Sequence, residues 1–192
     1  MKLCLLPPLA ALALVTLAVP GLYAQATTFR IDPARSTVVY EMSHPAHSFS
    51  GTSRQVSGTV TTNAAGVITA ATVSAPVQSF SSGNRSRDSN MIEATEAYIH
   101  RNVTFQLTGL TMLATPTAEA NATAEGTLTF HGVRQTVRVP VLVQRSGSGD
   151  DLRVRGAFDV TLSQFRVSPP RLLGVPVRDQ IHLILDLTAR RS

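Results

Sequence analysis

Apolar and polar residues alternate along most of the chain beyond residue 35, which is typical of strands that bury one face. In residues 152–163 every even position holds an apolar residue or glycine, and the odd positions hold polar residues and one alanine. Thr, Val and Ile are frequent in these runs, as they are in strands generally. The alternation predicts eight strands, over residues 36–44, 55–62, 67–80, 102–108, 122–130, 136–143, 152–163 and 178–189.

One segment departs from this pattern. Residues 87–98 place Met91, Ile92, Ala94 and Thr95 near a single stripe, which predicts a short helix. Antiparallel strands with one buried face form either a sandwich or a closed barrel. Eight strands favour the barrel, because that number encloses an interior just wide enough for side chains or one slender ligand. We therefore predict an all-β fold, an elongated eight-stranded antiparallel up-and-down β-barrel with one short helical insertion.

The first 26 residues are expected to be a secretory signal peptide. A short basic start is followed by a run of Leu, Ala and Val over residues 3–19, and small residues precede the expected cleavage after Ala26, with Ala24 as the alternative. The mature domain then covers residues 27–192. Cys4 is the one cysteine of the chain, so cleavage would leave no thiol for disulfides or for cysteine chemistry.

Composition argues against two classes of protein. Removal of Lys2 leaves 16 Arg against 12 acidic residues, a net charge near +4, and the Arg residues are scattered rather than clustered as nucleic-acid binding requires. An outer-membrane barrel would need an outward apolar band with aromatic girdles. The chain has no Trp, seven Phe and three Tyr, so we expect the apolar faces to point inward.

Candidate catalytic groups are few. His44 and His47 are near neighbours, but Pro45 argues against the helical spacing of a zinc motif, and two polar residues in a strand-end loop is the favoured interpretation. His100, His131 and His182 are isolated in sequence, and no nucleophile elbow is present. Glu93 and Glu96 are more typical of a solvated helix face. We predict neither a catalytic site nor a metal site, and no enzyme.

The hairpin GTLTFHGVRQTVRVPV at residues 126–141 carries the apolar face around a His-Gly bend. Leu128 and Phe130 share one face, while His131 shares the other and is expected to begin the turn, away from the barrel interior. Glycines inside strands, here Gly126 and Gly156, destabilise the strand unless something needs the space. These two glycines therefore favour an interior cavity over a filled core.

Five segments, in order, give the mature chain a resemblance to the YceI-like, polyisoprenoid-binding family. They are FRIDP at 29–33 with STVVY at 36–40, RD at 87–88 with NVTF at 102–105, GTLTFHGV at 126–133, FDV at 158–160 with SQFRV at 163–167, and VRDQIHLILDL at 177–187. The resemblance implies a lipocalin-like barrel, exported to the periplasm, that holds an isoprenoid or fatty-acyl lipid and needs no other cofactor. It leaves open transient contact with a membrane surface or membrane proteins, and either a monomer or a homodimer.

Alternation and the implied ligand together predict which residues contact the lipid. The residues expected to line the interior are Tyr40, Met42, Phe105, Leu107, Leu128, Phe130, Phe158, Val160, Ile181 and Leu183. Met91, Ile92 and Tyr98 are expected to form a helical lid. Arg87 and Asp88 are interpreted as a structural pair that anchors the helix. Two alternatives remain: a metal-dependent periplasmic enzyme using His44 and His47, and a fully packed barrel that serves as a stress or interaction module.

Overall fold

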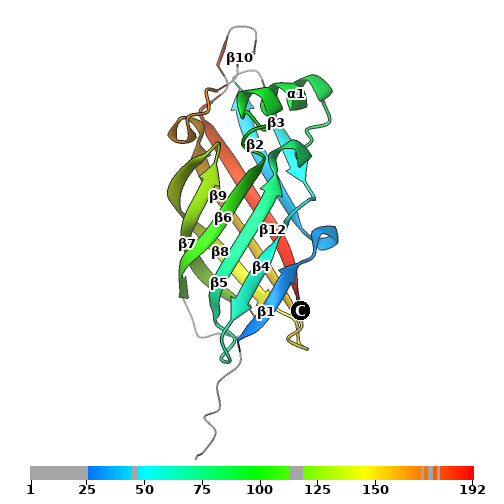
Figure 1. The fold of residues 1–192 in the computed structure, drawn as a ribbon, viewed down its shortest axis with the longest axis vertical. Helices are drawn as coiled ribbons and strands as arrows, with labels where there is room; N and C mark the ends of the chain where they lie inside the picture. The colour runs from blue at the N-terminus through cyan, green and yellow to red at the C-terminus, as the bar shows by residue number, and fades with distance from the viewer. Residues whose placement is uncertain (1–25, 45–46, 113–118, 170, 173–174, 177) are drawn as a thin grey trace, which may run out of the picture.

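The computed structural model of the protein describes residues 26–44, 47–112, 119–169, 171–172, 175–176 and 178–192. It contains a ten-stranded antiparallel sheet in which β1, β4, β5, β6, β7, β8, β9 and β12 close into a ring, with β2 and β3 added alongside β12. Figure 1 shows the ring as a tall barrel of tilted strands, with α1 across one end and the C-terminus near the other. The prediction of a closed eight-stranded antiparallel barrel with one short helix is confirmed.

The elements follow one another with short connections. The strands of the large sheet are β1 (Thr27–Ile31), β2 (Thr37–His44), β3 (His47–Ser53), β4 (Ser57–Thr62), β5 (Ile68–Pro76), β6 (Asn102–Met112), β7 (Glu119–Phe130), β8 (Val133–Arg145), β9 (Asp151–Thr161) and β12 (Gln180–Arg191). A separate small hairpin pairs β10 (Arg171–Leu172) with β11 (Val175–Pro176). The helices are α1 (Arg85–Ala94) and the 3-10 turns η1 (Pro33–Arg35), η2 (Val77–Ser79) and η3 (Leu162–Phe165).

Strand β12 closes the ring. One of its edges pairs with β9 from Gln180 to Arg190, and its other edge pairs first with β2 and then with β1. At the junction between β2 and β1, the Ser36 hydroxyl accepts a hydrogen bond from the Thr188 backbone N–H (3.0 Å), and the Asp32 N–H donates to the Thr188 carbonyl (2.8 Å). These bonds satisfy the backbone of Thr188 where the two strands leave a gap, so the wall stays closed.

Four strands had no strand prediction: β1 and β3 of the large sheet, and the two-residue strands β10 and β11. Strand β1 has only five residues, and β3 reads HSFSGTS, without the apolar alternation on which the prediction depended. The helix also differs in its limits. It begins at Arg85, after the Asn84 side chain accepts a hydrogen bond from the Arg87 N–H (3.1 Å), and it ends at Ala94 rather than at Tyr98.

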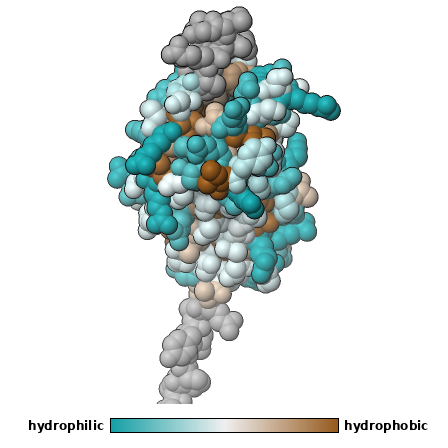
Figure 2. Space-filling view, turned by 45° about the horizontal axis from the view of Figure 1, so that its top comes forward, coloured by the Kyte–Doolittle hydropathy of each residue, from teal (hydrophilic) through white to brown (hydrophobic). Residues whose placement is uncertain are grey.

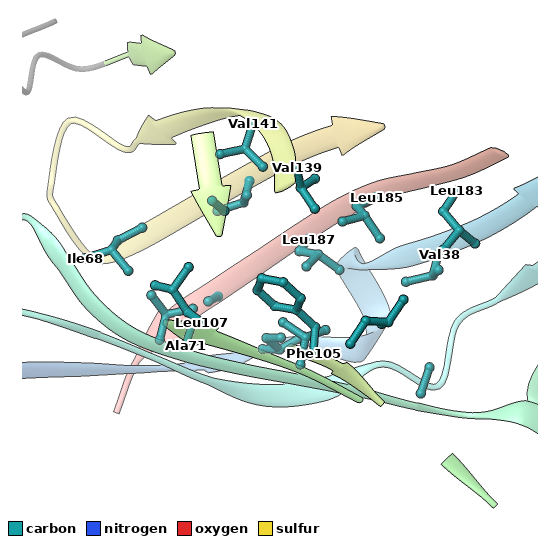
Figure 3. A pocket seen from close by; sticks show the side chains of 18 of the residues that line it. Val38, Ile68, Ala71, Phe105, Leu107, Val139, Val141, Leu183, Leu185 and Leu187 are labelled. Carbon is teal, nitrogen blue, oxygen red and sulfur yellow. The ribbon is translucent and has the colours of Figure 1, made fainter. Parts of the chain in front are cut away.

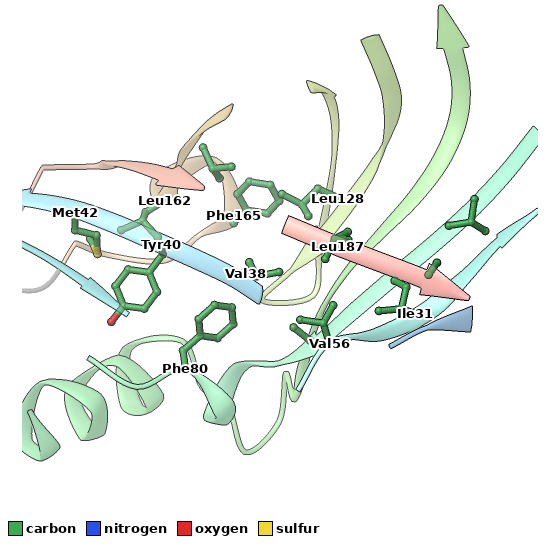
Figure 4. Close-up of a cluster of buried hydrophobic side chains, with 14 of the residues drawn as sticks. Ile31, Val38, Tyr40, Met42, Val56, Phe80, Leu128, Leu162, Phe165 and Leu187 are labelled. Atoms are coloured by element: carbon green, nitrogen blue, oxygen red, sulfur yellow. The ribbon is translucent and has the colours of Figure 1, made fainter. Parts of the chain in front are cut away.

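The barrel interior holds most of the buried apolar side chains. Phe29, Val56, Leu152 and Phe165 are almost completely buried. Figure 4 shows this cluster from the α1 end, where Tyr40 and Phe80 lie, to the opposite end at Ile31. The outer surface carries cross-strand ion pairs such as Arg138–Glu125 and Arg153–Asp186. The apolar faces therefore point inward, as the alternation predicted.

Gly126 does not leave an empty space in the barrel, although the sequence pattern favours a cavity beside a glycine inside a strand. A β-carbon added there would collide with the Phe105 ring and with the Gln106 carbonyl. The space beside this strand glycine is therefore filled by an aromatic side chain of the neighbouring strand.

No helix in the described part of the chain is long and apolar enough to span a bilayer.

Candidate functional site

A wholly apolar cavity of about 140 Å³ lies in the part of the barrel remote from α1. Figure 3 shows Ala71, Phe105 and Leu107 on one side of this lower cavity and Val139, Leu185 and Leu187 on the other. Every residue that lines it is Ala, Val, Ile, Leu or Phe. Such a space offers no hydrogen-bond partner, so it suits a hydrocarbon group and disfavours water.

A second cavity, of about 370 Å³, lies beneath α1. Its wall is apolar on the strand side, where Tyr40, Met42 and Ile181 contribute, but α1 and the turns beside it add polar groups. These groups are Asn84, Ser86, Arg87, Asn90 and Thr95. The upper cavity therefore has an apolar floor and a polar roof, and its volume falls in the range of small-molecule sites.

The two cavities adjoin. Phe80, Val103, Leu128 and Leu183 line both of them. The two cavities therefore lie end to end in the barrel, one with a polar side under α1 and the other purely apolar. Figure 2, which turns the α1 end towards the viewer, shows apolar side chains between hydrophilic ones on this face.

The structure places most of the residues predicted to contact a ligand on the walls of these cavities. The lower cavity takes Phe105, Leu107 and Phe158, the upper cavity takes Tyr40, Met42, Met91, Phe130, Val160 and Ile181, and both take Leu128 and Leu183. Their contact with a lipid stays a prediction.

Two residues of the predicted helical lid lie elsewhere. Ile92 is half-buried but lines neither cavity, and Tyr98 is 72% exposed. Tyr98 lies beyond the end of α1 at Ala94, and Ile92 directly follows Met91, so its side chain points about 100° away around the helix. Met91 alone of the three faces the cavity.

Several lining residues were missed by the sequence analysis. Val38, Val154, Leu185 and Leu187 belong to the same alternating faces as their predicted neighbours, so the signal was present. Phe80 was predicted as the end of the strand over residues 67–80, but β5 ends at Pro76 and Phe80 lies just after η2. The centres of the Phe80 and Tyr40 rings are 5.8 Å apart. Phe80 lies where the two cavities adjoin, because it lines both of them.

The pair Arg87 and Asp88 divides into two separate roles. Asp88 holds α1 to the preceding segment, because its carboxylate accepts hydrogen bonds from the Ser82 N–H (2.9 Å), the Ser82 hydroxyl (2.5 Å) and the Ser81 hydroxyl (3.2 Å). Burial alone would raise the pKa of Asp88, but these hydrogen bonds outweigh it and lower the pKa. Arg87 instead stacks 4.6 Å above the Phe49 ring and lines the upper cavity.

Tyr40 forms part of the same wall. Burial, and secondarily the charge of Asp88, raise the pKa of its phenol above the ordinary value. Tyr40 therefore presents a neutral hydroxyl at neutral pH.

Replacement of Asp88 by Asn is expected to lower the free energy of unfolding by about 1 kcal/mol, after allowance for solvent screening, and to loosen α1. The lowered pKa means that the carboxylate stabilises the fold above its unfolded-state pKa of about 3.9 and loses this effect as pH falls through the folded-state value. Urea unfolding at pH 7 and pH 3 checks this, with the exposed Glu93→Gln as control. An equal difference between Asp88→Asn and wild type at both pH values would contradict it.

The histidines fall into three groups. His44 and His47 pair across the end of the β2–β3 hairpin, as the strand-end interpretation expected, but their side chains lie outside the described residues. His182 contacts Asp159 (Nδ1 to Oδ1, 2.8 Å) on the outer surface. His100 and His131, which the sequence left isolated, come together with Glu96 beside α1. His131 follows β7 in the turn and faces away from the cavities, as predicted.

Comparisons with known proteins agree with this geometry. The model of the YceI-like domain matches residues 29–189. Burkholderia cenocepacia BcnA is 21% identical with a TM-score of 0.69, over 82% of this chain and 98% of that one. A polyisoprenoid binding domain from Saccharophagus degradans implicated in plant cell wall breakdown is 14% identical with a TM-score of 0.69, over 86% and 99%.

A Campylobacter jejuni YCEI protein is 15% identical with a TM-score of 0.54, over 100% of this chain and 99% of that one. Identities this low establish likeness of fold alone. A comparison with curated protein sequences found no match. The family model, however, covers nearly all of the barrel, from β1 to β12. The chain therefore belongs to the YceI-like family.

Proposed function

We propose that the protein binds a polyisoprenoid or a similar long-chain amphiphile inside its barrel and acts as a carrier or sequestering protein. The observation that carries the proposal is the pair of adjoining cavities, one with a polar roof under α1 and the other wholly apolar. An amphiphile has the same division of chemistry. Its hydrocarbon chain would occupy the lower cavity and its head group would lie beneath α1.

Burial of the chain supplies the affinity. Each buried methylene contributes about 0.8 kcal/mol, so ten of them contribute about 8 kcal/mol before the entropic cost of association. No hydrogen bond is needed for this part of the ligand. The binding is therefore selective for chain length and shape rather than for a particular functional group.

The head group would meet the polar side chains of the upper cavity. Arg87 is the cation among the described residues that line it, and its stacking on Phe49 fixes the guanidinium at the roof. Asn84 and Asn90 offer amide groups on the same segment. We infer that the head group is polar or anionic, because these groups donate hydrogen bonds towards it.

The two alternatives have less support. A packed interaction module needs a filled interior, whereas two cavities lie within this barrel. An enzyme using His44 and His47 would place its chemistry at the tip of the β2–β3 hairpin. Export to the periplasm, with removal of residues 1–26 as a signal peptide, belongs to the same proposal.

Extraction of the purified protein with organic solvent, followed by mass spectrometry, tests the proposal. We expect a long-chain lipid to co-purify, and delipidated protein to take up an added prenol or isoprenoid quinone at about one molecule per chain. The control is the same protein after it has been unfolded in denaturant, and this unfolded protein should retain no lipid. Repeated absence of both co-purified and added lipid would refute the proposal.

A further inference from the structure

We propose that Glu96, His100 and His131 form a binding site for a divalent transition metal, of which Zn²⁺ is the best match, on the outside of the upper cavity. The three side chains offer one carboxylate oxygen and two imidazole nitrogens, all within 4.8 Å of one another. His₂Glu is one of the ligand sets that hold zinc with a fourth position open. The site is independent of any ligand inside the barrel.

His131 carries the strongest signal. Its Nδ1 lies 3.0 Å from the Phe165 carbonyl oxygen, which can only accept, so Nδ1 bears the proton of that hydrogen bond. In the neutral ring the lone pair is then on Nε2. This nitrogen is buried and has no hydrogen-bond partner in the described part of the chain. A metal-binding histidine is usually held in this way, with its other ring N–H bonded to a carbonyl.

The distances suit a zinc ion. Zinc bonds of about 2.0–2.1 Å in tetrahedral geometry place ligand atoms about 3.3 Å apart. Glu96 Oε2 lies 3.3 Å from His131 Nε2 and 3.8 Å from His100 Nε2. The His100 and His131 rings meet edge to face with their centres 4.8 Å apart. The two imidazole nitrogens lie within 4.8 Å of each other, so coordination would require the His100 side chain, which is 30% exposed, to move closer to His131.

The backbone holds the three residues in place without a metal. The Glu96 carbonyl accepts hydrogen bonds from the N–H groups of Ile99 (2.8 Å) and His100 (2.9 Å), so the two ligands of this segment keep a fixed spacing. Glu96 and His131 are both non-glycine residues with positive φ, 46° and 48°. A β-carbon at Gly132, whose φ is 72°, would come within 2.8 Å of the His100 ring, so glycine leaves room for that ring.

A plain ion pair explains these contacts less well. His131 and Glu96 are close enough for one, but their geometry does not make a hydrogen bond. A protonated His131 would also lie against the ring of His100. A metal ion accepts electron pairs from all three groups at once, and the half-exposed Glu96 leaves it a route from solvent.

A metal ion bound at this site would connect two segments of the chain that are far apart in sequence. Glu96 and His100 follow α1, whereas His131 belongs to the turn between β7 and β8. Their immediate neighbours Thr95 and Phe130 line the upper cavity. A bound metal would therefore fasten the segment after the helical roof to the barrel wall.

Titration of untagged, chelator-treated protein with Zn²⁺ by calorimetry tests the site. We expect one Zn²⁺ per chain, and the visible spectrum of tetrahedral Co²⁺ when Co²⁺ replaces it. His100→Ala and Glu96→Gln should each weaken the affinity roughly tenfold or more. Zinc at about 100 times its Kd should also raise the Tm of the wild type by about 5 °C.

Two control variants separate this site from the other histidines. His182→Ala, on the outer surface, should bind Zn²⁺ as the wild type does. So should the double variant His44→Ala/His47→Ala. Absence of stoichiometric binding, unchanged affinity in His100→Ala, or loss of binding in either control would overturn the proposal. Circular dichroism confirms that each variant is folded before it is scored.

Discussion

The variant Phe158→Arg is expected to lose lipid loading completely while the protein still folds. Phe158 lines the lower cavity and pairs across the strands with Leu183, which lies where the two cavities join. A guanidinium placed there would face only apolar groups, and an unpaired buried charge costs several kcal/mol. Entry of a hydrocarbon chain would bury this charge further. Mass spectrometry of the extracted lipid and uptake of an added prenol measure the effect.

The matched control is Ala157→Arg. Ala157 is the adjacent residue of β9 and lies outside both cavity walls, so the same charge should leave loading unchanged. If Phe158→Arg does not fold, Leu183→Trp provides the test, because a larger apolar side chain should close the junction at a cost of about 1–3 kcal/mol. Normal loading in a folded Phe158→Arg or Leu183→Trp would show that the ligand does not occupy these cavities.

The second large effect concerns stability. Phe29 is completely buried, and its strand pairs with both β4 and β12. Truncation to Ala is expected to lower the free energy of unfolding by about 3–5 kcal/mol, since it removes a large apolar side chain and leaves a cavity. The Tm should fall by about 10 °C. Thermal and urea unfolding followed by circular dichroism measure both quantities.

Phe49→Ala is the comparison for this variant. Phe49 is half-buried under Arg87 at the α1 end, so its truncation should cost clearly less than that of Phe29. The two variants should also differ in ligand binding, because Phe49 lines the upper cavity and Phe29 lines neither. Equal destabilisation by the two substitutions would contradict the expectation that the completely buried Phe29 contributes more to stability than the half-buried Phe49.

Much of the barrel could be predicted because alternation reports directly on which face is buried. Runs such as residues 152–163 have side chains that point alternately inward and outward, and the structure follows the same register. The cavity walls followed from this rule at Leu128, Phe158 and Leu183. The rule could not recover β3, because its Ser and Gly residues carry no periodic signal. It also extended a strand to Phe80, which instead reaches the cavities from beyond η2.

The histidine cluster shows a different limit. Glu96 and His100 are neighbours on one segment, but His131 meets them only because the β7–β8 turn folds against the end of the helical segment. Proximity of this kind depends on the tertiary fold and leaves no trace in local spacing. The space beside Gly126 could not be interpreted for the same reason, since the ring that fills it comes from β6.

The way β12 closes the ring has a consequence for the order of folding. The last strand of the chain pairs with β9, β2 and β1, so the first and last strands must find each other across nearly the whole sequence. Until the C-terminal residues are available, β9 and β2 each present an unpaired edge. Contacts between such distant residues make closure slow, and a chain that lacks its final strand is left as an open sheet prone to self-association.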